Sequence, residues 1–559
     1  MKKGFTLVEL IGVIIILALI MLLAVPPILN SIRSTRNELS DASKKIIYTA
    51  ANLYVSENLN DFPKYDGNTF CVSIDTLSKK EYLPTIVYDS TTGDEIPKDS
   101  LVEIKVENNN YTYNMNNECV EYIYDPYSLI NILLKQYNES NEVGLLKDST
   151  NENLYYYTGT EEQVSNNYLW YGGHQWRVLE FDTNENSITL ISQQPLTAIY
   201  SANSVWTTQS AYESSYINTW LNDYFYNSLD STVKINIVDN TFNVGIYTDV
   251  DEIITKQKVG LLDEEQYKRA GSNESYLNIG NIFGLANRES SSSMRFVSNI
   301  GNILNDVVSL SHGIRPVIKI SDITIIEGNG SLENSYCYKN KSTNTNNVQV
   351  GEYINVPYNG SDNACGSDNM CTFRVISKNN DSIKVVLNGL LPKKSAWATD
   401  ASDNITTSDL VYTNVLNGFI ANIDSKYITT GKYGVGMYSI GGNYTVPQNT
   451  TITANVGLPT VGEMFSGNDI NMAVPKDGAK TFVDVNTIEN PTVSSYYWTM
   501  NRYRMNYVLG NAAGGWLVDG YYEFWDYSLA SGIRPTIYLK NNLSFTGGNG
   551  TAQSPYILQ

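Results

Sequence analysis

A run of 20 apolar residues, 10–29, is the strongest pattern of hydrophobic positions in the chain. A helix needs about 20 such residues to cross a bilayer. A secretory signal peptide instead has a shorter apolar region that ends in small residues before its cleavage site. The run therefore predicts a membrane-spanning helix. One residue is unexplained, because the carboxylate of Glu9 lies at the edge of the run, where burying a charge is costly.

The polar segment after this run keeps a helical pattern. Apolar residues recur at intervals of seven, at Ile32, Leu39, Ile46 and Leu53. One apolar stripe on a polar helix indicates that this face packs on another element. In residues 101–107 apolar and polar side chains alternate, which is typical of a short strand. We therefore expect the stripe to lie on a small antiparallel sheet.

The rest of the chain contains one pattern twice. The string QWRVLEF, which includes Arg177, matches TFRVISK, which includes Arg374. Further on, GIRPVIKI with Arg315 matches GIRPTIYL with Arg534, and a GNG turn signal follows each match. The matched strings keep their order, which predicts two homologous domains.

These patterns together predict an α+β multidomain chain. A long N-terminal helix has a transmembrane half and an amphipathic half, and the amphipathic half packs on a small antiparallel sheet. Two homologous, β-rich mixed domains follow. The first repeat spans residues 123–336, counting a leading connection, and the second repeat spans residues 362–559. Residues 337–361 are polar and are expected to be a linker that contains one strand at most.

The charge balance limits the partners of the chain. It has 58 acidic and 38 basic residues, a net charge of −20. Nucleic-acid binding needs basic side chains to neutralise phosphates, so we expect no nucleic-acid partner. Tyrosine is abundant, with 42 residues, and its ring can be half-buried while its hydroxyl forms a hydrogen bond. This composition favours an extracellular, strand-rich protein.

Five cysteines fall into two groups. The first group is Cys71 and Cys119, and the second is Cys337, Cys365 and Cys371. Outside the membrane each group can form one disulfide, which leaves one thiol over. We favour the pair Cys71–Cys119. A zinc site is the alternative for the second group, but His174 and His312 are not at ligand spacing from it.

The N-terminal string KKGFTLVEL, followed by the apolar run, resembles the start of type IV prepilins and pseudopilins. The resemblance implies a leader of residues 1–4, which is short for the family but basic, and cleavage after Gly4. Phe5 is then the new N-terminus and is methylated. A prepilin peptidase and methylase are therefore expected partners.

The same resemblance implies the organisation of the N-terminal region. Residues 5–30 correspond to the transmembrane and assembly helix, and residues 31–122 to a pilin-like globular domain stapled by Cys71–Cys119. In a filament these helices bundle, and the Glu9 carboxylate can meet the Phe5 amine of a neighbouring subunit. Such a pair offsets the desolvation of both charges. The alternative is an acid that is tolerated at the membrane interface.

The repeats resemble uncharacterised extracellular repeats of Gram-positive bacteria and, distantly, the C-type-lectin-like fold. In the second repeat, aromatic and acidic residues gather in the segment 510–528. The candidate ligand-binding residues there are Trp516, Asp519, Tyr522, Glu523, Trp525 and Asp526. Their rings can stack on sugars and their carboxylates can bind hydroxyls or Ca²⁺, and apart from Ca²⁺ at this place we expect no cofactor. The alternative is that these aromatics are half-buried core residues.

The matched arginines have two interpretations. They line a binding groove, or each guanidinium is held by a carboxylate or by loop carbonyl groups and has a structural role, which we favour. No catalytic motif is recognisable, so we expect no enzyme activity. The chain is interpreted as a pilin-like subunit, minor or at the tip, with an adhesive extracellular head.

That interpretation predicts location and partners. Before assembly the chain is held in the cytoplasmic membrane by one span with its C-terminal part outside, and afterwards it lies in an extracellular filament. Other pilin subunits, the pilus assembly machinery and a host or surface ligand are expected partners. Two alternatives stay open: a major pilin or pseudopilin of a secretion or DNA-uptake filament, and a membrane-anchored surface protein.

Overall fold

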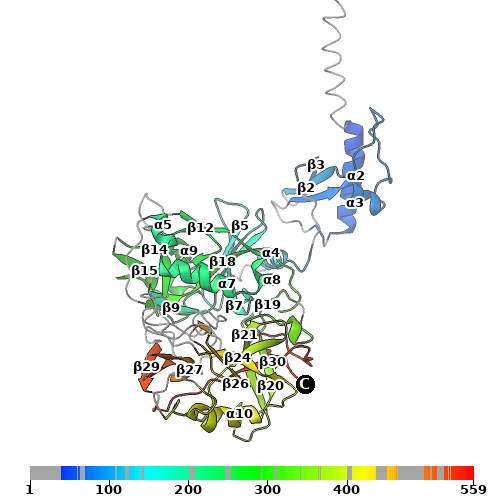
Figure 1. The fold of residues 1–559 in the computed structure, drawn as a ribbon. Helices are drawn as coiled ribbons and strands as arrows, with labels where there is room; N and C mark the ends of the chain where they lie inside the picture. Colours follow the sequence, from blue (N-terminus) through cyan, green and yellow to red (C-terminus); the bar gives the residue numbers. More distant parts are fainter. Residues whose placement is uncertain are drawn as a thin grey trace, which may run out of the picture. The chain divides into compact units, whose positions relative to one another are not determined.

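The structure, a computed structural model, describes the chain from residue 40 onward with gaps. The described residues are 40–59, 61–62, 64, 69–107, 110–119, 125–139, 144–200, 208–245, 254–290, 292–307, 311–339, 341–362, 364–365, 367–399, 406–435, 450–460, 462–463, 496–503, 507–512, 522–526, 528 and 530–559. They form a mixed α/β structure with several sheets and few helices (Figure 1). The chain divides into an N-terminal unit, Met1–Pro126, and a C-terminal unit, Tyr127–Gln559.

In the N-terminal unit a helix packs on a three-stranded antiparallel sheet of order β1-β2-β3. The elements are α2 (Asp41–Glu57), β1 (Thr69–Ser73), α3 (Ile74–Lys79), β2 (Leu101–Glu107) and β3 (Asn110–Met115). The alternation expected in residues 101–107 is confirmed, because Val102, Ile104 and Val106 are fully buried. The disulfide Cys71–Cys119, the favoured pair, joins β1 to the turn after β3, with 6.2 Å between the Cα atoms.

The apolar stripe predicted for this helix is wrong in phase. Ile46 and Leu53 are 55% and 48% exposed, whereas Ile47, Ala51 and Val55 are fully buried. The buried residues follow one another at intervals of four, which keeps them on one face of a helix, and the small Ala51 allows close approach to the sheet. The other members of the predicted stripe lie outside the described residues: Ile32 and Leu39.

The C-terminal unit contains two large sheets, one for each repeat, and several smaller ones. In the first repeat the order is β10-β18-β8-β7-β5-β4, β13 also pairs with β18, and β6 pairs with β7 and β19. Its strands are β4 (Leu145–Lys147), β5 (Leu154–Tyr157), β6 (Tyr168–Tyr171), β7 (His174–Asp182), β8 (Ser187–Ser192), β10 (Ile237–Val238), β13 (Val259–Leu261), β18 (Pro316–Ser321) and β19 (Tyr336–Cys337).

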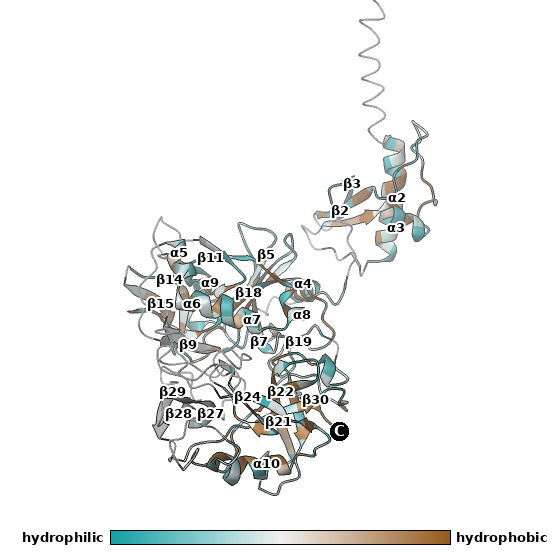
Figure 2. Cartoon of the chain, in the orientation of Figure 1, coloured by the Kyte–Doolittle hydropathy of each residue, from teal (hydrophilic) through white to brown (hydrophobic). Residues whose placement is uncertain are grey.

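In the second repeat the order is β23-β30-β22-β21-β20-β31, and β26 also pairs with β30. Its strands are β20 (Tyr353–Pro357), β21 (Met370–Lys378), β22 (Ser382–Leu387), β23 (Ile428–Thr429), β26 (Val456–Gly457), β30 (Thr536–Lys540) and β31 (Tyr556–Ile557). Hydrophobic residues are concentrated in β2 of the N-terminal unit and in the strands of this sheet (Figure 2).

All seven strands of the second sheet have counterparts in the nine-stranded first sheet, which has β4 and β5 in addition. In both, the strand that follows the Arg-Pro pair lies beside the hairpin strand β8 or β22, and a late short strand, β19 or β31, adds in parallel at β6 or β20. The hairpin register slips at the same place, between Val178 and Glu180 in the first repeat and between Val375 and Ser377 in the second. This is the arrangement expected of two copies of one domain.

Shorter elements surround the two sheets. In the first repeat they are α4 (Leu129–Glu139), β9 (Thr197–Tyr200), α5 (Gln209–Glu213), α6 (Tyr216–Asn218), the π-helix η1 (Thr219–Phe225), α7 (Tyr226–Ser228), α8 (Ser231–Lys234), β11 (Asn240–Asn243), β12 (Ile254–Gln257), α9 (Glu264–Arg269), η2 (Ser272–Glu274), β14 (Phe283–Arg288), β15 (Ser293–Val297), β16 (Ile303–Val307) and β17 (Ser311–Ile314). In the rest of the unit they are η3 (Thr345–Asn347), the π-helix η4 (Tyr412–Leu416), α10 (Asn417–Ala421), β24 (Gly431–Gly434), β25 (Thr451–Ala454), β27 (Tyr496–Tyr503), β28 (Tyr507–Ala512) and β29 (Tyr522–Asp526).

Residues 337–361 differ from the linker that we expected. Cys337 ends β19 in the first sheet, and β20 lies between β21 and β31 in the second sheet. The segment is therefore divided between the two sheets. β20 is the one strand that the sequence allowed here, but its position inside the second sheet depends on pairing with β21 and β31 and was not predicted.

Candidate functional site

The residues that the sequence singled out at the N-terminus lie outside the described residues. These are Gly4, Phe5, Glu9 and the membrane helix expected over 5–30. Within the part of the chain that the structure describes, no helix is long and apolar enough to cross a membrane.

The candidate ligand-binding residues of the second repeat are described only in part. Trp516 and Asp519 lie outside the described residues. The backbone of the other four lies in β29, which pairs with β28 at the end of the sheet β27-β28-β29: Tyr522, Glu523, Trp525 and Asp526. The described residues contain no group of three or more His, Cys, Asp or Glu that could hold a metal ion.

The first repeat has a strand in the corresponding place. β16 ends the sheet β16-β15-β14-β17-β9, and Leu304 and Val307 on it are 48% and 50% exposed. In each repeat, therefore, a comparable strand forms the edge of a smaller sheet, although of these two strands only β29 has aromatic residues. The correspondence of β16 and β29 could not be found by matching sequences, because the two strands have different residues at every position.

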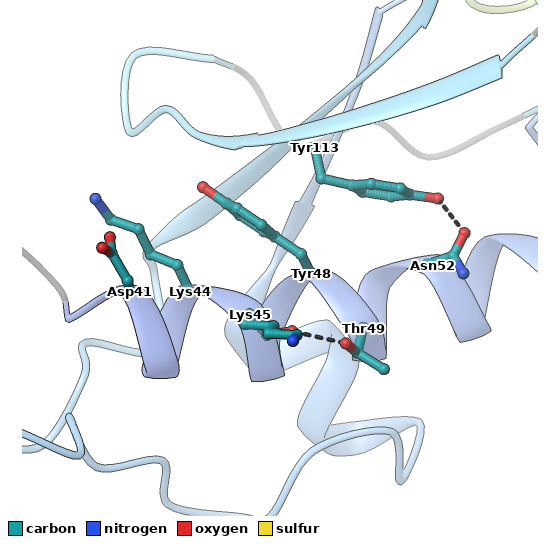
Figure 3. A pocket seen from close by; sticks show the side chains of 7 residues that line it. All are labelled: Asp41, Lys44, Lys45, Tyr48, Thr49, Asn52 and Tyr113. Carbon is teal, nitrogen blue, oxygen red and sulfur yellow. Dashed lines mark hydrogen bonds between the residues drawn. The ribbon is translucent and has the colours of Figure 1, made fainter.

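A surface groove of about 400 Å³ lies between α2 and β3 in the N-terminal unit (Figure 3). Its lining residues are Asp41, Lys44, Lys45, Tyr48, Thr49, Asn52 and Tyr113. The hydroxyl of Tyr48 accepts a hydrogen bond from the backbone N–H of Met115 at 3.0 Å, and the Tyr113 hydroxyl donates to Asn52 Oδ1 at 2.9 Å. Both rings are thus held in place. Burial raises the pKa of Tyr113 well above its ordinary value, so its hydroxyl stays protonated.

The groove adjoins the exposed apolar residues of the same helix. Ile46 lies three residues before Thr49, which lines the groove, and Leu53 lies four residues after it, so both exposed apolar side chains neighbour Thr49 on the helix surface. Aromatic rings held by hydrogen bonds, with cations and exposed aliphatic groups beside them, are suited to binding another protein surface. The sequence contains a signal for this groove, because Lys44, Tyr48 and Asn52 follow at intervals of four.

The arginines of the repeats are structural, as we favoured. The Arg177 side chain has no exposed surface and donates to Glu161 Oε2 at 2.8 Å, to the Tyr168 hydroxyl at 2.6 Å and to Asn167 Oδ1. Arg315 donates to the carbonyl oxygens of Ser192 and Leu277, and Arg534 donates to that of Leu387, the residue of β22 that corresponds to Ser192. Burial, then the charge of Arg177, lowers the pKa of Arg315 to about 9.

Arg374 belongs to a junction between the repeats. Its Nη2 donates to the carbonyl oxygen of Gly173 at 2.8 Å, although Arg177, its counterpart, binds within its own repeat. The backbones of Gly173 and Gly351 touch: a Cβ on Gly173 would lie 2.4 Å from the Gly351 Cα. Gln349 Nε2 adds a hydrogen bond to Thr232 Oγ1 at 2.7 Å. The two repeats are therefore joined by direct contacts as well as by the chain.

His174 is buried beside this junction. Its Nδ1 has no hydrogen-bond partner among the described residues, and its ring contacts that of Phe225 at 5.6 Å between centroids. The pKa of His174 is held well below its ordinary value of 6.5, first by burial and then by the charge of Arg374. The folded chain thus keeps this imidazole neutral, whereas the unfolded chain protonates it near pH 6.5.

We expect acidification to destabilise the C-terminal unit through His174. Its folded pKa is depressed, so its contribution is complete above pH 6.5 and is lost as pH falls below that value. The loss is about 1.4 kcal/mol per pH unit until the folded pKa is reached. Urea unfolding at about pH 7.5 and about pH 5.5 should show a smaller pH dependence in His174→Phe, by about 1 kcal/mol. An equal pH dependence in both proteins would contradict this assignment.

The second group of cysteines forms the other disulfide. Cys365 pairs with Cys371, with 4.5 Å between the Cα atoms, and the remaining thiol is that of Cys337. Cys337 is buried, and burial raises the pKa of its thiol. This agrees with the expectation of one disulfide in each group and one cysteine left over.

Comparison with known proteins adds no relative: no protein-family model, no curated protein and no solved structure matches this chain.

Proposed function

We propose that this chain is a type IV pilin-like filament subunit whose C-terminal unit is an extracellular head for adhesion or ligand binding. The motif around Gly4, Phe5 and Glu9 supports it at the level of sequence. A long N-terminal helix would run from the membrane segment 5–30 into α2. The bulk of the head favours a minor or tip subunit, because so large a domain on every subunit would crowd a filament shaft.

The observation that carries the proposal is the uncovered face of α2. Ile46 and Leu53 are apolar, about half exposed and seven residues apart on a helix whose own sheet covers another face. A helix with a second apolar face is suited to packing against a further helix or domain. The groove with Tyr48 and Tyr113 lies beside that face and widens the surface that a neighbouring subunit can contact.

Processing at the N-terminus is the direct test of the proposal. The mature protein, purified from its own cell envelope, should lack residues 1–4 and carry a methyl group on Phe5 by intact-mass analysis. An uncut N-terminus would overturn the proposal and leave the membrane-anchored surface protein as the alternative. The number of copies per filament separates a tip or minor subunit from a major pilin or pseudopilin.

Glu9→Val tests the assembly role of the acid. Within the proposal, the Phe5 amine of a neighbour then lacks its partner, and we expect incorporation into filaments to fall about tenfold, the effect of ~1.4 kcal/mol. Cleavage and membrane insertion should be unchanged, because valine extends the apolar run. Quantitative immunoblots of sheared filaments and membranes measure both quantities. Normal incorporation of this variant would contradict the pairing with Phe5.

The double variant Ile46→Ser, Leu53→Ser tests the uncovered helix face. Both side chains are already exposed, so the unfolding free energy should change by less than about 0.5 kcal/mol per site. Loss of their burial in the filament should lower incorporation about tenfold. Ile86→Ser is the matched control, because Ile86 is 43% exposed in the same unit but lies outside α2. An equal effect of control and double variant would show that this face is not special.

A further inference from the structure

A buried ion pair distinguishes the second repeat from the first. Lys384 Nζ lies 2.6 Å from Glu463 Oε1, and neither side chain has any exposed surface. The ammonium faces two buried rings, with 4.9 Å to the centroid of Tyr433 and 5.7 Å to that of Tyr538. The hydroxyls of these tyrosines are used elsewhere, because they donate to the carbonyl oxygens of Thr536 and Lys432.

The first repeat has neutral groups at the corresponding places. Lys384 in β22 lies opposite Tyr538, whereas in β8 Thr189 lies opposite Lys319. Gln266 corresponds to Glu463, because the spacing between them (463 − 266 = 197) equals that between Arg177 and Arg374 (374 − 177 = 197). The first repeat therefore folds without this ion pair. Burying two charges away from solvent costs more free energy than burying a neutral pair.

The orientation of the Glu463 carboxyl is fixed by its own turn. Oε2 accepts the backbone N–H of Thr460 at 2.8 Å, and Thr460 Oγ1 accepts the backbone N–H of Glu463 at 3.1 Å. Gln266 makes the same reciprocal contact with Asp263 in the first repeat. One carboxyl oxygen is therefore held by an N–H donor, while the other meets the lysine.

We infer that Lys384 and Glu463 are the site of an intramolecular amide cross-link. The Nζ lone pair, freed when the ammonium passes a proton to the carboxylate, attacks the carboxyl carbon. Negative charge then develops on Oε2, where the N–H of Thr460 donates. Oε1 leaves as water with two of the three ammonium protons, and one proton stays on the new amide nitrogen. The reaction needs no oxidant, reductant or further reactant.

The surroundings favour this condensation. Two groups held in contact react with an effective concentration of up to about 10⁵–10⁸ M, far above that of separate molecules. The product is a neutral amide, which removes the cost of keeping two charges in a site without water. The cross-link would join Lys384 of β22 covalently to Glu463, which lies in the turn after β26, within the core of the second repeat. It is independent of any role in a filament.

Mass spectrometry of the intact full chain tests the inference. The measured mass of the wild-type protein should be lower, by the mass of one water molecule, than the mass calculated from its sequence with two disulfides. After reduction, trypsin should give one branched peptide that joins residues 379–393, still uncleaved at Lys384, to residues 433–476. The cross-linked peptide excludes loss of water from another residue.

Two variants complete the test. Lys384→Thr, which carries the residue of the first repeat, should have its full mass and give no branched peptide. The double variant Lys384→Thr, Glu463→Gln restores both residues of the first repeat and should also have its full mass while remaining folded. A folded wild-type chain of full mass, without the branched peptide after prolonged incubation, would overturn the inference and leave an ion pair only.

Discussion

Arg177→Met should lower the unfolding free energy of the C-terminal unit by about 3–5 kcal/mol. The guanidinium has no exposed surface, and its removal leaves the Oδ1 of buried Asn167 and the carbonyl oxygen of Val164 without their donor. Each buried polar atom left unpaired costs about 1–3 kcal/mol. The contact of the guanidinium with the Tyr168 ring, 3.9 Å from its centroid, is lost as well. Urea unfolding followed by tryptophan fluorescence measures the change.

The control for Arg177→Met is Lys258→Met. Lys258 pairs with Asp239 at 3.1 Å, but the two side chains are 37% and 49% exposed. Surface ion pairs contribute about 0–1 kcal/mol, so this variant should be close to wild type. If Arg177→Met lost no more free energy than Lys258→Met, the network around Arg177 would not have the structural role assigned to it.

Gly173→Ala should disrupt the junction of the two repeats. Gly173 has a φ of +77°, and its new methyl group would lie 2.4 Å from the Cα of Gly351 and 2.6 Å from the carbonyl oxygen of Val350. Backbone atoms cannot yield as a flexible side chain can, so β7 and the segment before β20 must separate. We expect a loss of about 2–5 kcal/mol from left-handed strain and overpacking together. By calorimetry the C-terminal unit, whose two repeats we expect to unfold together in the wild type, should then unfold in two transitions.

Gly280→Ala separates the two causes. Gly280 has a nearly equal φ of +75°, but no atom lies within 4 Å of the place that its new methyl group would occupy. Its loss should therefore be limited to the backbone strain of about 1–2 kcal/mol, with one transition retained. Equal losses at Gly173 and Gly280 would show that the contact between the repeats contributes little.

Local patterns predicted many elements of the fold. The alternation in residues 101–107 became β2. The matched strings around Arg177 and Arg374 became β7 and β21, which occupy corresponding places in the two large sheets. These features depend on neighbours within a few residues, so composition and spacing are sufficient to find them.

Apart from the disulfide Cys71–Cys119, the features that depend on distant partners were not predicted. The heptad through Ile46 and Leu53 suggested the wrong buried face of α2, because the sheet selects whichever face offers the closest fit. Arg177 and Arg374 occupy the same place in matched strands, yet one binds within its repeat and the other across the junction. The groove beside Tyr48 arises only when β3 brings Tyr113 to α2.

The sequence by itself determined the apolar run, the cleavage-like motif, the repetition of one domain and the grouping of the cysteines, because each is a property of residue order and spacing. The tertiary structure decided which face of α2 is uncovered, how residues 337–361 are divided between two sheets, and that Lys384 meets Glu463 across 79 positions of the chain. Such contacts depend on the packing of whole sheets, and close packing tolerates only those side chains whose volume and polarity fit.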